Sequence, residues 1–261
     1  MIRAMRTAAS GMLAQQMQVD TIANNIANVN TTSFKKDALA FRSLLYRTFR
    51  EPGAITAGNL MNPTGLQVGS GAEISSSIKM HVQGDLEPTG NELDVAINGP
   101  GFFRVRLSNG EFRYTRDGTF RKDANGDMVT VDGYRLEPSI NIPIDAQTIS
   151  IAQDGTVTVT QAGGGTKEAG QVLLIRFANP AGLKAVGSNL FSETLSSGIA
   201  TPQTPGLNGM GFLRNGFRER SNVQIVDELI ELIQAQRNYE VNSRTIRVGD
   251  EMLQQVSNLV R

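Results

Sequence analysis

Apolar residues recur every seven positions at both ends of this chain of 261 residues, and this heptad spacing limits the fold more than any other feature. Such a repeat is typical of long helices that pair through one apolar seam. No proline interrupts the N-terminal repeat, and Gly11 is the only weak helix former within it. Its first seam position holds Met5, Met12, Val19 and Ile26, and its second holds Ala8, Gln15, Ile22 and Val29.

The C-terminal repeat is the longer of the two. Ser221, followed three residues later by Gln224, has the pattern of a capping box and predicts where the helix begins. A helix from there to the C-terminus has about 36 residues and a length of roughly 50 Å, too long for an ordinary compact domain. The seam positions hold Ile225, Leu232, Tyr239, Ile246, Leu253 and Val260.

One helix alone cannot bury such a seam, so we expect the two terminal helices to pack on each other. Their charges agree with this pairing, because residues 1–50 carry a net charge of +5 and residues 221–261 a net charge of −2. We therefore predict a coiled-coil-like terminal domain of paired helices, 1–34 plus 222–261. One alternative is that the two helices cap a globular core. A second alternative is a helix that lies on a membrane surface, but its polar face is rich in amides rather than in basic residues, which argues against it.

The middle of the chain has the pattern of antiparallel β structure. Short alternating runs are separated by Asn-Gly and Asp-Gly pairs, which favour two-residue hairpin turns because both residues tolerate positive φ. The clearest hairpin signal is Asp154-Gly155, flanked by the runs 149–151 and 157–160. The predicted fold class is α+β, with an antiparallel all-β domain at 92–195.

Between the helices and the β domain we predict an extended connecting segment, 35–91 plus 196–221. It includes residues 46–71, which show little periodicity and are too numerous for an ordinary loop. We expect this stretch to be an extended functional segment.

Composition excludes several classes of function. Lys+Arg and Asp+Glu number 25 each, which argues against a globally basic nucleic-acid binder. With no cysteine and a single histidine, His81, the chain lacks thiolate nucleophiles, disulfides and Cys/His metal centres. Residues 123–127 depart from a calcium loop in the place of the glycine and the missing final Glu, which favours a β-turn. We predict no catalytic, cofactor-binding or metal-binding residues.

The pattern of apolar residues predicts no targeting signal. No run reaches the roughly 18 residues of a membrane-spanning helix. The N-terminal segment is broken by Arg6, Thr7, Ser10 and Gln15, unlike the apolar stretch of a secretory signal. We expect a cytosolic protein, or one exported by a route that cleaves no signal peptide.

Four motifs carry a resemblance to a known family. Residues 22–35, IANNIANVNTTSFK, resemble the N-terminal signature of the bacterial flagellar rod and hook proteins, and residues 236–243, QRNYEVNS, resemble their C-terminal signature. Residues 93–103, LDVAINGPGFF, and 114–120, YTRDGTF, are similar to the start of that family's β domain. The motifs occur in the family's order and span the chain from end to end.

Within the family, the chain length and segment 46–71 are similar to the distal-rod members. One departure is Ser33, which stands where the family usually has glycine. If that backbone requires positive φ, a serine there is mildly strained. Rival predictions are another axial subunit, of the proximal rod or hook-like, and a secreted β-domain binding module.

The resemblance implies a structural protein rather than an enzyme, without cofactors. It implies that the terminal helices build an inner tube, that the β domain forms an outer layer, and that subunits stack helically around an export channel. The implied place is the periplasm-spanning rod of the flagellar basal body, where the rod transmits motor torque to the hook. The implied partners are further copies of the chain, the proximal rod proteins, the hook protein, the P-ring and L-ring proteins, and the flagellar type III export apparatus, with no nucleic acid and no membrane span.

The same resemblance assigns three sets of residues. A rod-specific stretch within 46–71 is expected to brace adjacent subunits, and it holds Pro52, Gly53, Asn62, Pro63 and Gly65. The buried amides that fix the register between neighbours are expected to include Asn25, Asn28 and Asn242. The apolar residues expected to pack subunits together are Met5, Met12, Val19, Ile22, Ile26, Ile225, Leu229, Leu232, Tyr239, Ile246 and Leu253.

Overall fold

The computed structural model describes residues 2–53, 55–56, 60–61, 63–161 and 165–259. The chain divides into two compact units. The first unit comprises residues 1–27, 37–79 and 224–261, and the second comprises 28–36 and 80–223. This division groups 37–79 with the helices, whereas the sequence placed those residues in the connecting segment. The reason is that the strands within 37–79 pack against the N-terminal helix.

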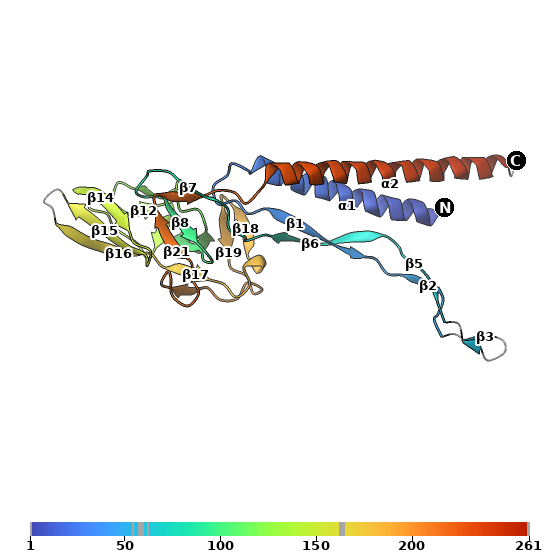
Figure 1. Cartoon of the computed structure of the whole chain (residues 1–261), viewed down its shortest axis with the longest axis horizontal. Coiled ribbons are helices and arrows are strands. Elements are labelled where there is room, and N and C mark those ends of the chain that lie inside the picture. Colours follow the sequence, from blue (N-terminus) through green and yellow to red (C-terminus); the bar gives the residue numbers. More distant parts are fainter. Residues whose placement is uncertain (1, 54, 57–59, 62, 162–164, 260–261) are drawn as a thin grey trace. The chain divides into compact units, whose positions relative to one another are not determined.

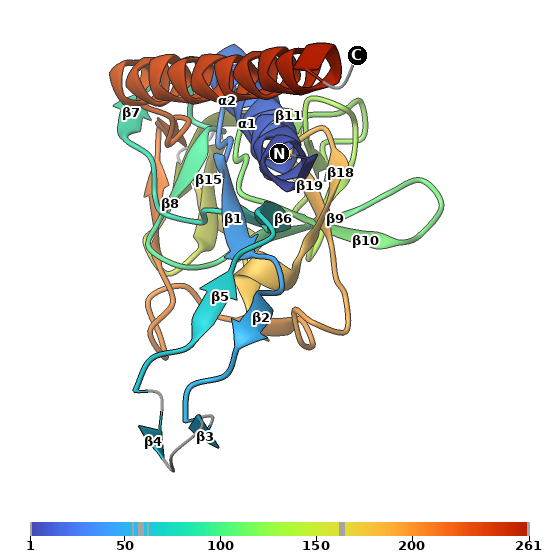
Figure 2. The ribbon, with the colours of Figure 1, turned by 90° about the vertical axis from the view of Figure 1, so that its right-hand side faces the viewer.

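The first unit contains the two long helices expected from the heptads. Helix α1 spans Ile2–Ala27 and helix α2 spans Ile225–Leu259, and the two lie side by side in both views (Figures 1 and 2). Asp227 and Glu228 occupy the first turn of α2, where negative charge is favoured by the helix dipole. The predicted α+β class is confirmed, since the rest of the chain is mostly antiparallel strand.

The rest of the first unit is a long two-stranded ribbon. Its base pairs β1 (Asp37–Ser43) with β6 (Ala72–Lys79). It continues through β2 (Arg47–Arg50) and β5 (Leu66–Val68) to β3 (Ile55–Thr56) and β4 (Leu60–Met61) (Figure 1). The described part of segment 46–71 is therefore an extended hairpin. A two-stranded ribbon is marginally stable alone, so its fully exposed β2 and β5 depend on further packing for order.

The second unit is built on a seven-stranded antiparallel sheet with the order β11-β12-β13-β9-β10-β19-β18. The sheet is joined by a three-stranded sheet, β14-β15-β16, and by the pairs β17-β20, β21-β8 and β22-β7. The bounds are β7 Leu86–Pro88, β8 Val95–Asn98, β9 Phe103–Arg106, β10 Phe112–Thr115, β11 Arg121–Lys122, β12 Met128–Val129, β13 Arg135–Glu137, β14 Ala146–Ile151, β15 Thr156–Gln161, β16 Thr166–Gln171, β17 Leu174–Arg176, β18 Lys184–Gly187, β19 Leu190–Ser192, β20 Thr201–Gln203, β21 Phe212–Asn215 and β22 Phe217–Glu219, with a 3-10 turn at Pro180–Gly182.

The predicted hairpin at Asp154-Gly155 is confirmed, because β14 pairs antiparallel with β15 and Ile151 faces Val157. The predicted β-turn at 123–127 is also confirmed. There the Asp123 carboxylate accepts hydrogen bonds from the backbone N–H groups of Asn125 and Asp127, at 2.8 and 2.9 Å. Carboxylate oxygens used in this way shape the turn rather than a cation site.

The core of the second unit is two clusters of side chains from alternating strand positions. In the larger cluster, Phe103 and Phe120 meet edge to face with ring centroids 5.2 Å apart, among aliphatic side chains from β8, β15, β17 and β21. In the smaller cluster, Phe102 packs edge to face on Phe177 and Phe191. His81 also packs on Phe102 and Phe191, both at 5.4 Å, so this histidine is part of an aromatic cluster.

Candidate assembly interface

The seam between α1 and α2 uses a heptad set on α2 of which the sequence analysis selected only Asn242. Glu228, Ala235, Asn242 and Gly249 lie seven apart and face α1, beside the half-buried Leu232, Ile246 and Leu253. Polar and small residues in this set carry no apolar signal, which is why the pattern of large residues missed it. A Cβ on Gly249 would lie 3.0 Å from Met5 Cγ, so the missing side chain lets the helices approach.

Gly11 on α1 plays the same part opposite Asn242. A Cβ at Gly11 would lie 2.9 Å from Asn242 Nδ2, so this glycine leaves room for the amide inside the seam. The one weak helix former in the N-terminal heptads therefore has a packing reason for its position.

Asn25 is buried, at 2% exposure, and its amide is satisfied within the first unit. Its Nδ2 donates to the Asp37 carbonyl at 3.0 Å and to Glu228 Oε2 at 3.1 Å, and its Oδ1 accepts from the Asp37 N–H at 3.0 Å. This one side chain thus joins α1, β1 and α2. Asn28 belongs to the second unit and accepts a bond from Thr31 Oγ1 at 3.0 Å.

The structure divides the predicted subunit-packing residues into two groups. Ile22 is buried, and Met5, Met12, Val19 and Ile26 are half-buried, all on α1. On α2, Leu232, Ile246 and Leu253 are half-buried, whereas the three others remain exposed: Ile225, Leu229 and Tyr239. Packing between the two helices of one chain therefore leaves part of the predicted set uncovered.

A second apolar stripe runs along α2. Successive helical residues are rotated by about 100°, which places Val226, Ile230 and Ile233 on the side of α2 opposite the seam and places Val241, Val248 and Met252 beside the seam. At its C-terminal half, the stripe borders a shallow groove of about 350 Å³ that also includes Ala4 of α1. The members of this outer stripe, each 41–69% exposed, are Val226, Ile230, Ile233, Val241, Val248 and Met252.

The rod-specific stretch lies in the ribbon of the first unit. Pro52, Gly53 and Pro63 are exposed, and Asn62 lies outside the described residues. A Cβ on Gly65 would lie 2.7 Å from both the Arg50 carbonyl oxygen and Pro52 Cδ. The two legs of the ribbon therefore meet at Gly65 with no room for a side chain.

A buried charged cluster fastens both ends of the second unit's chain to its β body. Glu219, on β22, sits between Lys35 and Arg116, and all three side chains are 0–3% exposed. Its Oε1 is 2.6 Å from Lys35 Nζ and its Oε2 is 2.9 Å from Arg116 Nε. We call Lys35, Arg116 and Glu219 the junction cluster. Burial lowers the pKa of Lys35, while the carboxylate of Glu219 acts in the opposite direction.

Backbone groups complete the junction cluster. Lys35 Nζ also donates to the Val82 carbonyl at 2.8 Å, and the Arg116 guanidinium donates to the carbonyls of Gly99 and Gly101, both at 3.0 Å. Because every charge has hydrogen-bond partners, the cluster can be buried without an unpaired ion.

Ser33 has φ 56°, so this position does adopt the left-handed conformation. This agrees with the glycine that the family usually has there. The serine is buried, its N–H donates to the Glu219 carbonyl at 2.8 Å, and its Oγ donates to the Arg116 carbonyl at 2.9 Å. The hydroxyl offsets the strain with a hydrogen bond that glycine cannot make.

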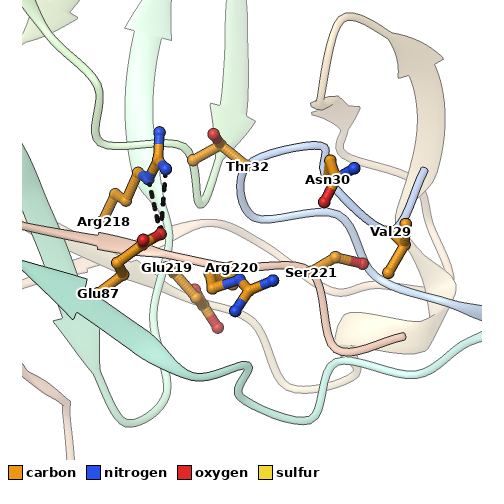
Figure 3. A pocket seen from close by; sticks show the side chains of 8 residues that line it. All are labelled: Val29, Asn30, Thr32, Glu87, Arg218, Glu219, Arg220 and Ser221. Atoms are coloured by element: carbon orange, nitrogen blue, oxygen red, sulfur yellow. Dashed lines mark hydrogen bonds and ion pairs between the residues drawn. The ribbon is translucent and has the colours of Figure 1, made fainter. Parts of the chain in front are cut away.

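Beside the junction cluster is a polar cleft of about 360 Å³ within the second unit (Figure 3). An exposed ion pair crosses it, in which Arg218 Nη2 lies 3.0 Å from Glu87 Oε2. The side chains that line this cleft form ion pairs; they do not place a nucleophile beside a base. The lining residues are Val29, Asn30, Thr32, Glu87, Arg218, Glu219, Arg220 and Ser221.

Across the residues that the structure describes, no three His, Asp or Glu side chains gather as metal ligands. In that same part of the chain, no helix has the length and apolar character needed to cross a membrane.

Comparison with known proteins decides the family. The family described as "Flagella basal body rod protein" matches residues 5–35, "Flagellar hook protein FlgE/F/G D1 domain" matches 96–159, and "Flagellar basal body rod FlgEFG protein C-terminal" matches 214–259. The flagellar basal-body rod protein FlgG of Borreliella burgdorferi is 46% identical, covering 100% of both chains. The chain belongs to the flagellar basal-body rod protein family.

Other relatives agree over their full length. FlgG of Buchnera aphidicola from Schizaphis graminum is 45% identical over 99% of this chain and 100% of its own, and FlgG of Bacillus subtilis is 41% identical over 100% of both. The predicted resemblance to the distal-rod members is confirmed, and the proximal-rod, hook-like and binding-module alternatives are not favoured. The chain is a structural subunit of the flagellar basal-body rod. Its matches cover both helical ends and the start of the β domain, so the family's features span both units.

Proposed function

We propose that this rod subunit polymerises helically through the outer stripe of α2, with α1 and α2 forming the inner layer of a hollow shaft. The observation that carries the proposal is that α2 has apolar side chains outside the seam, opposite it at 226–233 and beside it at 241–252, and that the chain itself leaves them exposed. A helix that is apolar on both sides is buried on both sides in its functional state. Contacts between unlike surfaces of identical subunits do not close, and they generate filaments.

The same proposal includes the setting of the shaft. The chain would be exported through the flagellar type III apparatus without a cleaved signal peptide, cross the periplasm inside the P-ring and L-ring proteins, and join the proximal rod proteins to the hook protein. It would transmit torque by packing alone, without catalysis or a cofactor. The membership in the rod family and the rigid pairing of long helices support this role.

The test is sedimentation of the purified full chain beside an Ile230→Asp/Val241→Asp variant. We expect the wild-type chain to form pelletable polymers and the variant to stay soluble, because two carboxylates within the stripe oppose its burial. Circular dichroism of the two monomers should agree, since both residues are exposed. Gln236→Asp, an exposed change elsewhere on α2, should polymerise normally. Equal polymerisation of the double variant would exclude the outer stripe as the assembly surface.

A second prediction concerns the ribbon. Deleting residues 54–65 should leave the β body of the second unit folded, because those residues belong to the first unit. The polymer should lose stiffness or straightness, since the bracing between adjacent subunits would be gone. Electron microscopy of assembled polymers measures both properties. Polymers of unchanged curvature and persistence length would contradict the bracing role.

A further inference from the structure

A basic cleft lies between the start of α1 and the ribbon, entirely within the first unit. Its volume is about 390 Å³. Arg3, Arg6 and Arg47 supply its charge, and Leu44 and Val68 supply an apolar floor. The cleft therefore combines cations at its rim with hydrocarbon at its base.

The three arginines have no acidic partner in the structure. Among the described residues of the first unit, ion pairs join Arg42 to Glu73 and Lys79 to Asp37, and no carboxylate pairs with Arg3, Arg6 or Arg47. The guanidinium carbons of Arg3 and Arg47 each lie 5.3 Å from the centroid of the Phe49 ring, which holds them in place. No acidic residue occupies the first turn of α1, so the helix dipole adds to the positive potential.

We propose that this basic cleft receives the first turns of α2 from a second copy of the chain. The proposal rests on the polymer proposed above and names one of its contacts. Asp227 and Glu231 lie four residues apart on an exposed side of α2, beside Val226 and Ile230 of the outer stripe. Their carboxylates match the arginines, and the two apolar side chains match the floor formed by Leu44 and Val68.

Asp227 and Glu231 of the same chain cannot reach the cleft. Glu228, one residue after Asp227, is bonded to Asn25 near the far end of α1. Asn25 lies 19 residues beyond Arg6, which corresponds to about 28 Å along the helix. The side chains of Arg6 and Glu231 cannot bridge such a gap. Asp227 and Glu231 can therefore enter the cleft only from a copy displaced along the helix axis.

Repulsion between like charges within each of the two surfaces also favours this contact. Asp227 and Glu231 repel each other at the i, i+4 spacing, as Arg3 and Arg6 do at the i, i+3 spacing. Bringing the two pairs together relieves both repulsions, and the attraction weakens as added salt screens it.

The experiment measures the critical concentration for polymerisation of the full chain. Arg3→Glu/Arg6→Glu and Asp227→Lys/Glu231→Lys should each raise it by about tenfold or more, because each places like charges face to face. The chain carrying all four changes should recover most of the loss, since the charges are then exchanged between the two surfaces. Lys167→Glu/Lys184→Glu makes the same net-charge change as Arg3→Glu/Arg6→Glu, on exposed residues of the second unit, and it should polymerise like the wild type.

Cross-linking tests the contact directly. Because the chain has no cysteine, Ser10→Cys in one preparation and Val226→Cys in another provide one thiol each. A short bismaleimide should join the two chains in mixed polymers, and the yield should fall when Arg3→Glu/Arg6→Glu is added.

The outcomes separate this contact from the polymer itself. If the wild type polymerises and both charge-reversed chains do so equally well, the cleft assignment is wrong and the helical polymer stands. If the wild type never polymerises, both proposals fail. If the cleft instead binds phosphatidylglycerol vesicles through Arg3 and Arg6 while polymerisation is unaffected by their reversal, its ligand is a lipid surface and the assignment is overturned.

Discussion

Replacing Glu219 by alanine is expected to lower the free energy of unfolding of the second unit by about 3–5 kcal/mol. The substitution leaves Lys35 and Arg116 buried, at 0% and 3% side-chain exposure, without the carboxylate that both contact. Each cation would keep its hydrogen bonds to backbone carbonyls but would have no negative charge to compensate for its lost hydration. Since the chain has no tryptophan, urea unfolding would be followed by circular dichroism and tyrosine fluorescence.

Glu87→Ala is the matched control. Glu87 also pairs with an arginine, Arg218, but the two side chains are 43% and 45% exposed. Exposed pairs contribute about 0–1 kcal/mol, so this variant should unfold almost like the wild type. Equal effects of the two substitutions would show that the junction cluster does not stabilise the fold as its burial indicates.

Replacing Gly118 by alanine is expected to destabilise the second unit by about 3 kcal/mol or more, through overpacking against rigid backbone. A Cβ at this position would lie 1.7 Å from the Val95 carbonyl oxygen. The Val95 N–H also donates to the Gly118 carbonyl at 2.9 Å, so relieving the clash breaks a hydrogen bond next to the core. Thermal unfolding followed by circular dichroism measures the loss.

Gly165→Ala is the control for this change. Gly165 is an exposed residue with no atom near the position of an added Cβ. Its substitution should change stability by about 0.5 kcal/mol or less. An equally small effect of Gly118→Ala would contradict the close approach between β8 and residues 114–120.

The sequence predicts the interface residues of α1 better than those of α2. On α1, the heptad positions Met5, Met12, Val19, Ile22 and Ile26 are all at least half-buried. On α2, apolar residues lie on two faces, and a pattern of large side chains cannot say which face meets α1. The choice is made by small and polar residues at 228, 235, 242 and 249, which permit close approach and one hydrogen bond to Asn25.

The ribbon shows a similar division. Its length and lack of a helical period indicate an extended segment, but not that residues 37–43 and 72–79 pair over seven registered positions. That pairing joins residues 29 to 42 positions apart, beyond the range of any local pattern. Gly65 is the one position where the sequence carries a signal, because only glycine allows the legs to meet there.

By itself, the sequence determined the long helices, the hairpin at 154–155 and the family, because heptad spacing, turn residues and motifs are local along the chain. Only the tertiary structure decided the junction cluster. Lys35, Arg116 and Glu219 are separated by 81 residues or more, and charged residues are expected at the surface. They are buried together because folding brings one carboxylate between two cations, and no pattern of neighbouring residues encodes that meeting.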